Sequence, residues 1–309
     1  METEKKTQTT TDHMTDRDLS EQIKKVTKES HVRAENTELM LSFQRGQVSL
    51  QQYKLLLCSL YEIYQALEEE LDRNSDHPGV APIYFPAELA RLESIEKDLE
   101  YFYGLNWREK IVVPGSNKKI QPQTQTGTPL TYFSRTDVSL MIIQSTNHSY
   151  FTFQIGKENP EFLVAHAYTR YLGDLSGGQV LGRIAQKSMG LKGSEGLSFF
   201  AFPGVSSPNL FKQLYRSRMN SVELTEEQRN GVLEEAVRAF ELNIQVFDDL
   251  QKMLSVTENK QQSCLAHSRS VNSKTLQIPG TLISASPLLR MVLGVFVALA
   301  TVSMGIYAF

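Results

Sequence analysis

The sequence predicts an all-α fold, with one multi-helix domain over residues 17–254 and appendages at both ends. Two observations predict it. Apolar residues recur every three or four positions over most of this range, which is the period of an amphipathic helix. Residues that cap helix N-termini stand directly before several of these periodic segments. Residues 1–16 show neither feature and are expected to be disordered.

The first helix is expected to begin after Asp18, because Asp18 and Glu21 have the spacing of an N-cap and its N3 partner. Lys24 and Lys28 precede His31 by seven and three residues and therefore share its side of the helix. An imidazole for a metal and two ammonium groups for carboxylates would suit one ligand. A lone histidine on a helix is nevertheless more often an ordinary core or surface residue. The apolar stripe of this helix is predicted from Ile23, Val26, Ser30, Ala34 and Leu41.

Three further helices are predicted from their periodicity and their ends. Residues 86–102 begin with a proline, which suits the first turn of a helix, and residues 225–254 open with Thr225 and Gln228 as a capping box. Residues 47–71 have an apolar face made of Val48, Tyr53, Leu57, Leu60, Tyr64, Leu67 and Leu71.

The most informative segment is the stretch of twenty residues from His166 to Ala185. Its apolar spacing is helical, yet four glycines interrupt it, and each glycine costs about 0.8–1 kcal/mol relative to alanine inside a helix. Two of them, Gly173 and Gly177, are four residues apart, so in a helix they leave a flat strip on one face with Asp174 beside it. Two interpretations stay open: close packing against another helix, or a seat for a wide planar group against bare backbone.

The C-terminal part predicts a tether and a membrane anchor. Residues 255–281 are rich in Ser, Gln, Asn and Thr and are expected to be a flexible linker to residues 282–309. The last nineteen residues contain no charge, and as a helix they would span about 28 Å, close to the thickness of a bilayer core. A buried core helix is the alternative, but such helices rarely lack a polar face. The N-terminus lacks the apolar stretch of a signal peptide, so the helical domain is expected to face the cytosol.

Composition argues against several other kinds of function. The chain of 309 residues has a formal net charge of −3 at pH 7 and no basic stripe interleaved with aromatic residues, which disfavours nucleic-acid binding. Its two cysteines, Cys58 and Cys264, lie in different settings, so no disulfide framework is expected. Residues 173–178 lie inside a helical pattern rather than after a strand, so they are not a dinucleotide fingerprint. Electrons for any redox reaction must therefore come from a partner.

Three segments closely resemble the heme oxygenase family, most of all its vertebrate inducible members. They are residues 166–185, residues 28–36 (KESHVRAEN) and residues 211–220 (FKQLYRSRMN). The resemblance covers most of residues 17–110 and 156–254. It implies that heme lies between a proximal helix, in which His31 is the iron ligand, and a kinked distal helix lined by Gly173 and Gly177.

The same resemblance implies roles for several polar residues. Asp174, with Tyr64 and Arg170, would act through ordered water to direct protonation toward hydroxylation of the heme ring. Glu35 follows His31 by one turn and could orient or polarise its imidazole, with simple solvent exposure as the alternative.

Other residues are expected to hold the heme in place. About half of five candidates are expected to bind the propionates, since fixed cations beside carboxylates select which edge of the disc faces the oxidant; the five are Lys24, Lys28, Tyr168, Lys212 and Arg216. Phe240 matches a family position beside the heme, and ordinary core packing is its alternative.

The resemblance implies an enzyme that cleaves heme, with O₂, to biliverdin, carbon monoxide and ferrous iron. Heme is then both substrate and cofactor, and NADPH electrons arrive through NADPH–cytochrome P450 reductase. Biliverdin reductase is a further candidate partner, and the expected location is the endoplasmic reticulum membrane. A basic docking patch for the reductase is expected from Arg183, Lys212, Arg216 and Arg218, with solvated helix faces as an equal alternative.

One segment, residues 111–154, departs from the family. Residues 112–130 are polar and turn-rich, and residues 139–154 favour β structure. A disordered excursion, a splice variant and a gene-model error that replaced part of a helix all remain open. A membrane-tethered heme-binding protein without turnover is therefore the alternative function, and a helical adaptor without heme is a third.

Overall fold

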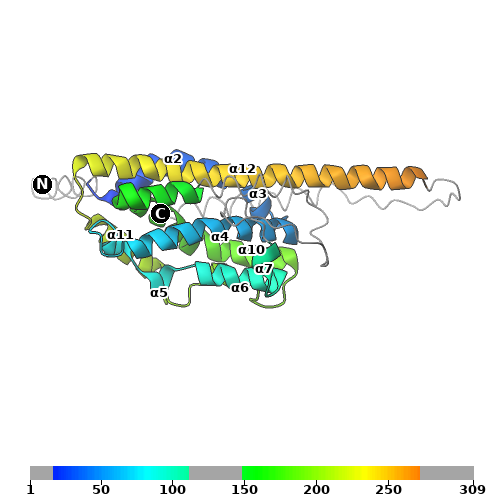
Figure 1. Ribbon diagram of the computed structural model, residues 1–309, viewed down its shortest axis with the longest axis horizontal. Coiled ribbons are helices and arrows are strands. Elements are labelled where there is room, and N and C mark those ends of the chain that lie inside the picture. The colour runs from blue at the N-terminus through cyan, green and yellow to red at the C-terminus, as the bar shows by residue number, and fades with distance from the viewer. Residues whose placement is uncertain (1–16, 111–147, 272–309) are drawn as a thin grey trace, which may run out of the picture.

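The computed structural model describes residues 17–110 and 148–271, and helices joined by turns make up this part of the chain, without a strand. The all-α prediction is confirmed for these residues (Figure 1). The longer helices are α2 (Leu19–Glu35), α3 (Glu38–Gln44), α4 (Leu50–Arg73), α6 (Leu92–Tyr103), α10 (Gln179–Met189), α11 (Pro208–Asn220) and α12 (Glu226–Val271). The short ones are η1 (Ala81–Ile83), α5 (Pro86–Leu89), α7 (Trp107–Lys110), η2 (Pro160–Phe162), α9 (Leu163–Ala167), η3 (Tyr168–Leu172), η4 (Asp174–Gly178) and η5 (Ser198–Phe200).

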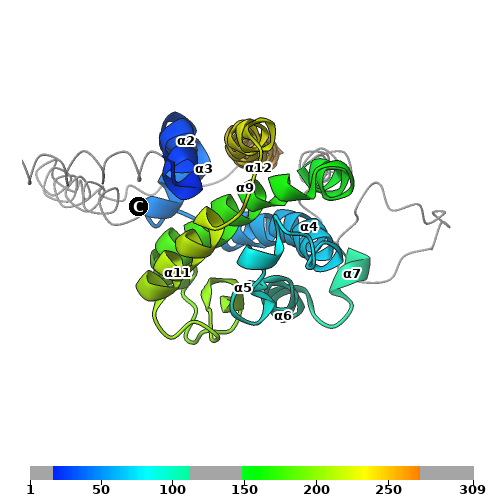
Figure 2. The ribbon, with the colours of Figure 1, turned by 90° about the vertical axis from the view of Figure 1, so that its left-hand side faces the viewer.

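The helices lie in layers. In both ribbon views α2 and α12 form one side of the molecule, α5 and α6 form the opposite side, and α4 lies between them (Figures 1 and 2). The central position of α4 explains its apolar face, because Tyr53, Leu57, Tyr64 and Leu67 are each 1% exposed or less. Residues on α4 are therefore placed to reach both outer layers.

Helix starts follow the local capping chemistry. α4 begins at Leu50 rather than at residue 47, because Ser49 and Gln52 form a reciprocal capping box there. The capping box of Thr225 and Gln228 is confirmed, with both hydrogen bonds present. Asp18 occupies the N-cap of α2 as predicted, but its side chain makes no capping hydrogen bond.

Two helical predictions need correction. The predicted helix over residues 86–102 is two helices, α5 and α6, separated by an extended Ala90. Arg91 and Leu92, which follow the break, donate their backbone N–H groups to the Glu68 carboxylate on α4. In α2 the buried side chains include Ile23, Thr27 and Ser30, whereas Val26 is 41% exposed, so Val26 is not part of the core stripe.

The predicted boundaries also differ at the two unusual segments. Residues 148–158 are helical, so the β prediction is wrong for residues 148–154. α12 continues to Val271, into the range predicted to be a linker. Residues 1–16, 111–147 and 272–309, including the predicted anchor, lie outside the described residues. Among the helices that are described, none combines the length and apolar character needed to cross a membrane.

Candidate heme site

The position of α2 is fixed by contacts with α12. Arg33 donates two hydrogen bonds to the Glu241 carboxylate, at 2.6 and 3.0 Å, and Ser30 donates a third at 3.2 Å. His31 lies between Ser30 and Arg33 in the sequence. Its ring meets Phe240 of α12 edge to face, with centroids 5.6 Å apart. α12 therefore sets the orientation of the helix and packs against its imidazole.

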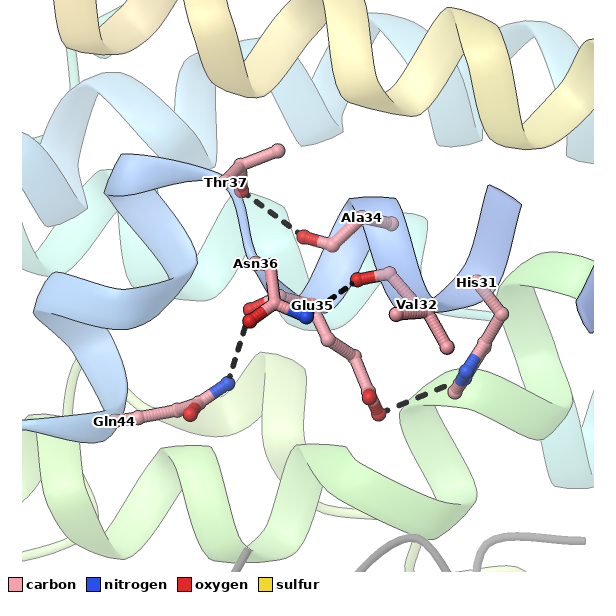
Figure 3. Close-up of polar contacts among 7 residues, drawn as sticks. All are labelled: His31, Val32, Ala34, Glu35, Asn36, Thr37 and Gln44. Atoms are coloured by element: carbon pink, nitrogen blue, oxygen red, sulfur yellow. Dashed lines mark hydrogen bonds and ion pairs between the residues drawn. The ribbon is translucent and has the colours of Figure 1, made fainter. Parts of the chain in front are cut away.

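His31 and Glu35 extend from the same side of α2 (Figure 3). His31 Nε2 lies 3.7 Å from Glu35 Oε1, and the His31 side chain is 23% exposed. Burial lowers the pKa of His31, and the Glu35 carboxylate opposes that shift. A lowered pKa favours the neutral imidazole, which is the form that binds a metal.

The end of α2 is held by side chains that donate hydrogen bonds to the backbone carbonyls of its last turn. Asn36 Nδ2 donates to the Val32 carbonyl at 2.7 Å, Thr37 donates to Ala34 at 3.0 Å, and Gln44 of α3 donates to Glu35 at 3.2 Å (Figure 3). These bonds satisfy carbonyls that a helix end leaves without partners. The turn directly after His31 is thereby kept in a fixed geometry.

The glycine-containing segment is a helix with π turns in its middle, and such turns kink a helix. α9 continues into two π-helical turns, η3 and η4, before α10 resumes ordinary α geometry. π turns inside α-helices are a known cause of kinks and recur at functional sites.

The glycines divide between the two interpretations that the sequence left open. A Cβ built at Gly173 or at Gly177 would meet nothing within 4 Å, so both face open space. A Cβ at Gly182 would lie 2.9 Å from the Phe200 side chain, so Gly182 serves close packing. The bare backbone at Gly173 and Gly177 leaves room for a flat group beside Asp174.

A polar network joins this open strip to the core. The Tyr64 hydroxyl donates to Asp174, and Arg170 Nε donates to Tyr64 at 3.3 Å. Arg170 also donates to Asn243 of α12 at 2.8 Å. Burial raises the pKa of Asp174, while the charges of Arg170 and Arg91 and the hydrogen bond from Tyr64 oppose that rise.

The candidate propionate ligands separate into two groups. Lys212 is only 6% exposed and donates to Ser176 at 3.1 Å, in the same π turn as Asp174. Its pKa is lowered by burial and by the nearby Arg216. Burial raises the pKa of Tyr168, and Arg216, through its charge and a hydrogen bond, opposes that rise, so these three candidates gather at the kinked segment.

The two lysines of α2 have different surroundings. Lys24 lies 3.7 Å from Glu21, and the charge of Glu21 raises the pKa of Tyr168. Lys28 is exposed. Lys212 is buried, which corrects its place in the expected docking patch, whereas Arg183 and Arg218 are exposed.

Sequence reasoning missed several buried polar partners of this site. Asn243 lies three residues after Phe240, and this helical spacing was a signal for a shared face. His166 Nε2 lies 2.9 Å from Glu235 of α12, and the His148 ring packs against His166 with centroids 5.4 Å apart. No pattern in the sequence pointed to Arg91, whose charge lowers the pKa of Asp174.

The residues fit a porphyrin better than a bare metal ion. In the described ranges, 17–110 and 148–271, no group of three or more His, Cys, Asp or Glu side chains could hold a metal. One accessible imidazole, an open glycine strip and a cluster of cations match a metal whose other ligands come from a planar, carboxylate-bearing group.

Comparison with known proteins identifies heme oxygenases as relatives of this chain. A sequence profile of the family described as "Heme oxygenase" matches residues 17–126 and 143–249. The chain is 67% identical over 308 residues to "Heme oxygenase" of Takifugu rubripes, with 100% of each chain covered. It is 45% identical over 304 residues to human "Heme oxygenase 1", with 94% of this chain and 96% of that one covered.

A solved structure agrees with the sequence comparisons. Heme oxygenase-1 from the cyanobacterium Synechocystis, in complex with heme, is similar with a TM-score of 0.66 and 33% identity. The similarity covers 80% of this chain and 99% of that one.

Proposed function

We propose, from the premise that this chain belongs to the heme oxygenase family, how its own residues bring about oxidative cleavage of heme to biliverdin, carbon monoxide and ferrous iron. The chain is an oxidoreductase of heme catabolism. The observation that best supports the mechanism is the open backbone at Gly173 and Gly177 directly beside Asp174. Bound heme is the substrate and supplies the redox-active iron.

The proximal residues bind and orient. His31 binds the iron through a ring nitrogen as a neutral imidazole, and Phe240, whose ring meets it at 5.6 Å, limits its rotation. Glu35 lies close enough to His31 to bias the orientation of the ring. Arg33 and Ser30 keep α2 in place through Glu241.

The distal residues control space and protons. The missing side chains at Gly173 and Gly177 allow the flat ring to approach the helix closely. Asp174 accepts a hydrogen bond from the Tyr64 hydroxyl, and Arg170 favours the ionised carboxylate. We propose that Asp174 and Tyr64, acting through ordered water, deliver the protons that favour hydroxylation of the heme ring.

The cationic cluster sets the rotation of the heme within its plane. Lys212, Arg216 and Tyr168, which gather at the kinked segment, bind the propionates, with Lys24 beside them. Because heme is nearly symmetric, the side on which its carboxylates are held decides which ring edge faces Asp174.

The partners and location follow from the same family. NADPH–cytochrome P450 reductase supplies electrons, and biliverdin reductase receives the product. The exposed Arg183 and Arg218 suit an acidic reductase surface. The uncharged residues 291–309 suit an anchor in the endoplasmic reticulum membrane, with the helical domain in the cytosol.

The helix at residues 148–158 argues against the alternative of heme binding without turnover. His148 and Thr152 are each 1% exposed, and Ser149 donates to the Glu62 carbonyl of α4 at 2.8 Å. The family profile resumes at residue 143. The segment after the unusual residues therefore packs into the core next to His166 instead of leaving a gap.

The test is a single-turnover and steady-state assay on the full chain in mild detergent. The protein, loaded with ferric heme, is mixed with NADPH and the reductase, and loss of the Soret band and appearance of biliverdin are followed. Asp174→Ala should keep heme and lose biliverdin formation, and His31→Ala should lose the heme-dependent Soret shift. The matched control is Asp72→Ala, which removes a carboxylate that accepts a tyrosine hydrogen bond, from Tyr84, at an exposed site. Stable heme without biliverdin in the unaltered chain would support the sequestering alternative instead.

A further inference from the structure

Arg91 is a buried cation at the break between α5 and α6. It is 3% exposed, and its backbone N–H donates to Glu68 at 2.5 Å. The break turns the side chain inward, where its guanidinium lies 3.8 Å from the centre of the Phe202 ring.

The hydrogen bonds of this guanidinium go to neutral carbonyls. Nε donates to Leu89 at 3.0 Å, and NH1 donates to Phe199 at 3.4 Å and also to Ala201. Carbonyl oxygens satisfy the donors but do not balance the charge. A buried cation is costly unless an anion lies near it.

Two carboxyl groups whose charges act on Arg91 can supply that anion, Glu68 and Asp174. The charged and titratable groups that act on it are Tyr64, Asp174, Glu68 and Tyr171. The two tyrosines stay neutral, because burial raises the pKa of each well above its usual value. Burial also raises the pKa of Glu68 to about 7, so Glu68 is mostly protonated in mildly acidic solution. Asp174 is then the other carboxyl group whose charge acts on Arg91.

Packing connects Arg91 with the Tyr64–Asp174 pair. The Phe199 ring meets the Tyr64 ring edge to face, with centroids 5.8 Å apart, and Tyr64 donates to Asp174. Phe199 is itself fixed, since the backbone N–H groups of Ser198 and Phe199 donate to Asp98 at 2.7 and 2.8 Å. Arg91 therefore contacts the turn that contains Phe199, and the side chain of this residue packs against the Tyr64 ring.

We propose that Arg91 is a positioning residue for heme cleavage: with Arg170 it forms a pair of buried cations that keeps Asp174 ionised as the acceptor of the Tyr64 hydrogen bond. The assignment rests on the proposed function in giving Asp174 its distal role. Arg170, Tyr64 and Arg91 are the groups that act on Asp174, and loss of one cation leaves the protonated acid relatively more stable.

The variants separate charge from shape. Arg91→Gln removes the charge and keeps an N–H donor for the carbonyls, whereas Arg91→Lys keeps the charge and loses the planar fork. Loss of an opposite charge near a carboxyl should raise the pH at which Asp174 protonates by about one unit in Arg91→Gln. Arg91→Lys should leave it close to that of the unaltered chain.

Two readouts test this on the full chain in mild detergent. In heme-free protein, acid titration of the infrared band of the Asp174 carboxylic acid, assigned by its absence in Asp174→Asn, reports the protonation directly. In heme-loaded protein with reductase, the acid limb of the pH profile of biliverdin formation should move to higher pH by the same amount in Arg91→Gln. An unchanged infrared midpoint in Arg91→Gln, or an equal shift in Arg91→Lys, would overturn the proposal.

Two further outcomes remain informative. If Arg91→Gln does not fold, Asp174→Asn combined with Arg91→Gln should fold again, because the buried carboxylate that Arg91 balances is then absent as well. Failure of the double variant to recover would also overturn the proposal. Absence of biliverdin from the unaltered chain would overturn the proposed function alone, since the infrared titration needs no turnover.

Discussion

Tyr64 donates its hydroxyl hydrogen bond to the carboxylate of Asp174, which connects the central helix α4 with the second π turn of the kinked helix. The two residues are 110 positions apart in the chain. Arg170 donates to the same hydroxyl, so Tyr64 both gives and accepts a hydrogen bond inside the core. The predictions below follow from this site and from the packing around it.

Tyr64→Phe should lower both stability and activity. The change leaves Asp174 and Arg170 each without one partner, and loss of a buried partner costs about 1–3 kcal/mol. We expect a lower free energy of unfolding at neutral pH and slower biliverdin formation, with heme still bound. Tyr84→Phe is the control, because the Tyr84 hydroxyl bonds to Asp72 at an exposed site. Equal effects of the two changes would contradict the role of Tyr64.

A larger side chain should weaken heme binding at Gly177 but lower the stability of the fold at Gly182. Gly177→Leu adds a side chain in open space, so the heme-free protein should stay folded while heme binding weakens by about tenfold or more, equivalent to about 1.4 kcal/mol. Gly182→Ala places a Cβ 2.9 Å from the Phe200 side chain and should lower the melting temperature. Heme titration followed at the Soret band and thermal unfolding separate the two effects. Unweakened heme binding by Gly177→Leu would place the heme elsewhere.

Lys212→Ala should change which biliverdin isomer is formed. Lys212 is buried next to the kinked segment, whereas Lys28 is exposed on α2. Without the Lys212 cation the propionates lose a fixed partner, so a mixture of isomers should replace a single one. Chromatography of the products checks this, with Lys28→Ala as the control that keeps a single isomer. A single isomer from Lys212→Ala would remove Lys212 from the propionate ligands.

Glu68→Gln should stabilise the protein increasingly as pH rises. The pKa of Glu68 is raised from 4.5 to about 7 in the folded state, mainly by burial. The folded chain therefore holds a proton that the unfolded chain releases, and the contribution of Glu68 to stability falls as pH rises from about 4.5 to about 7. Glutamine has no such dependence and keeps an oxygen acceptor for the N–H groups of Arg91 and Leu92.

The difference between Glu68→Gln and the unaltered chain should reach at most about 3 kcal/mol by pH 8 and vanish near pH 4.5. Unfolding experiments at several pH values measure it. Glu93→Gln, on the exposed start of α6 and paired with Lys97, is the control and should show no gain that grows with pH. A pH-independent effect of Glu68→Gln would contradict the raised pKa.

Much of the fold and part of the site could be predicted from the sequence. Helical periodicity and caps are local properties, so α2, α4 and α12 were found, and the capping box of Thr225 and Gln228 was correct. His31 and the glycines could be proposed as site residues because their motifs are contiguous, and their roles stay predictions. The break at Ala90–Arg91 was missed, since it is stabilised by Glu68 from another helix rather than by neighbours in the chain.

The sequence alone determined the helical class, the family and the short motifs that contain His31 and Asp174, because each depends on residues within a few turns of one another. Only the tertiary structure decided which glycines face open space, that Lys212 is buried, and that Asn243 and Arg91 belong to the surroundings of Asp174. These properties depend on side chains brought together from distant helices. Burial and charge compensation act through space, and their effects follow the packing of α4, α6, α12 and the kinked helix rather than the order of residues.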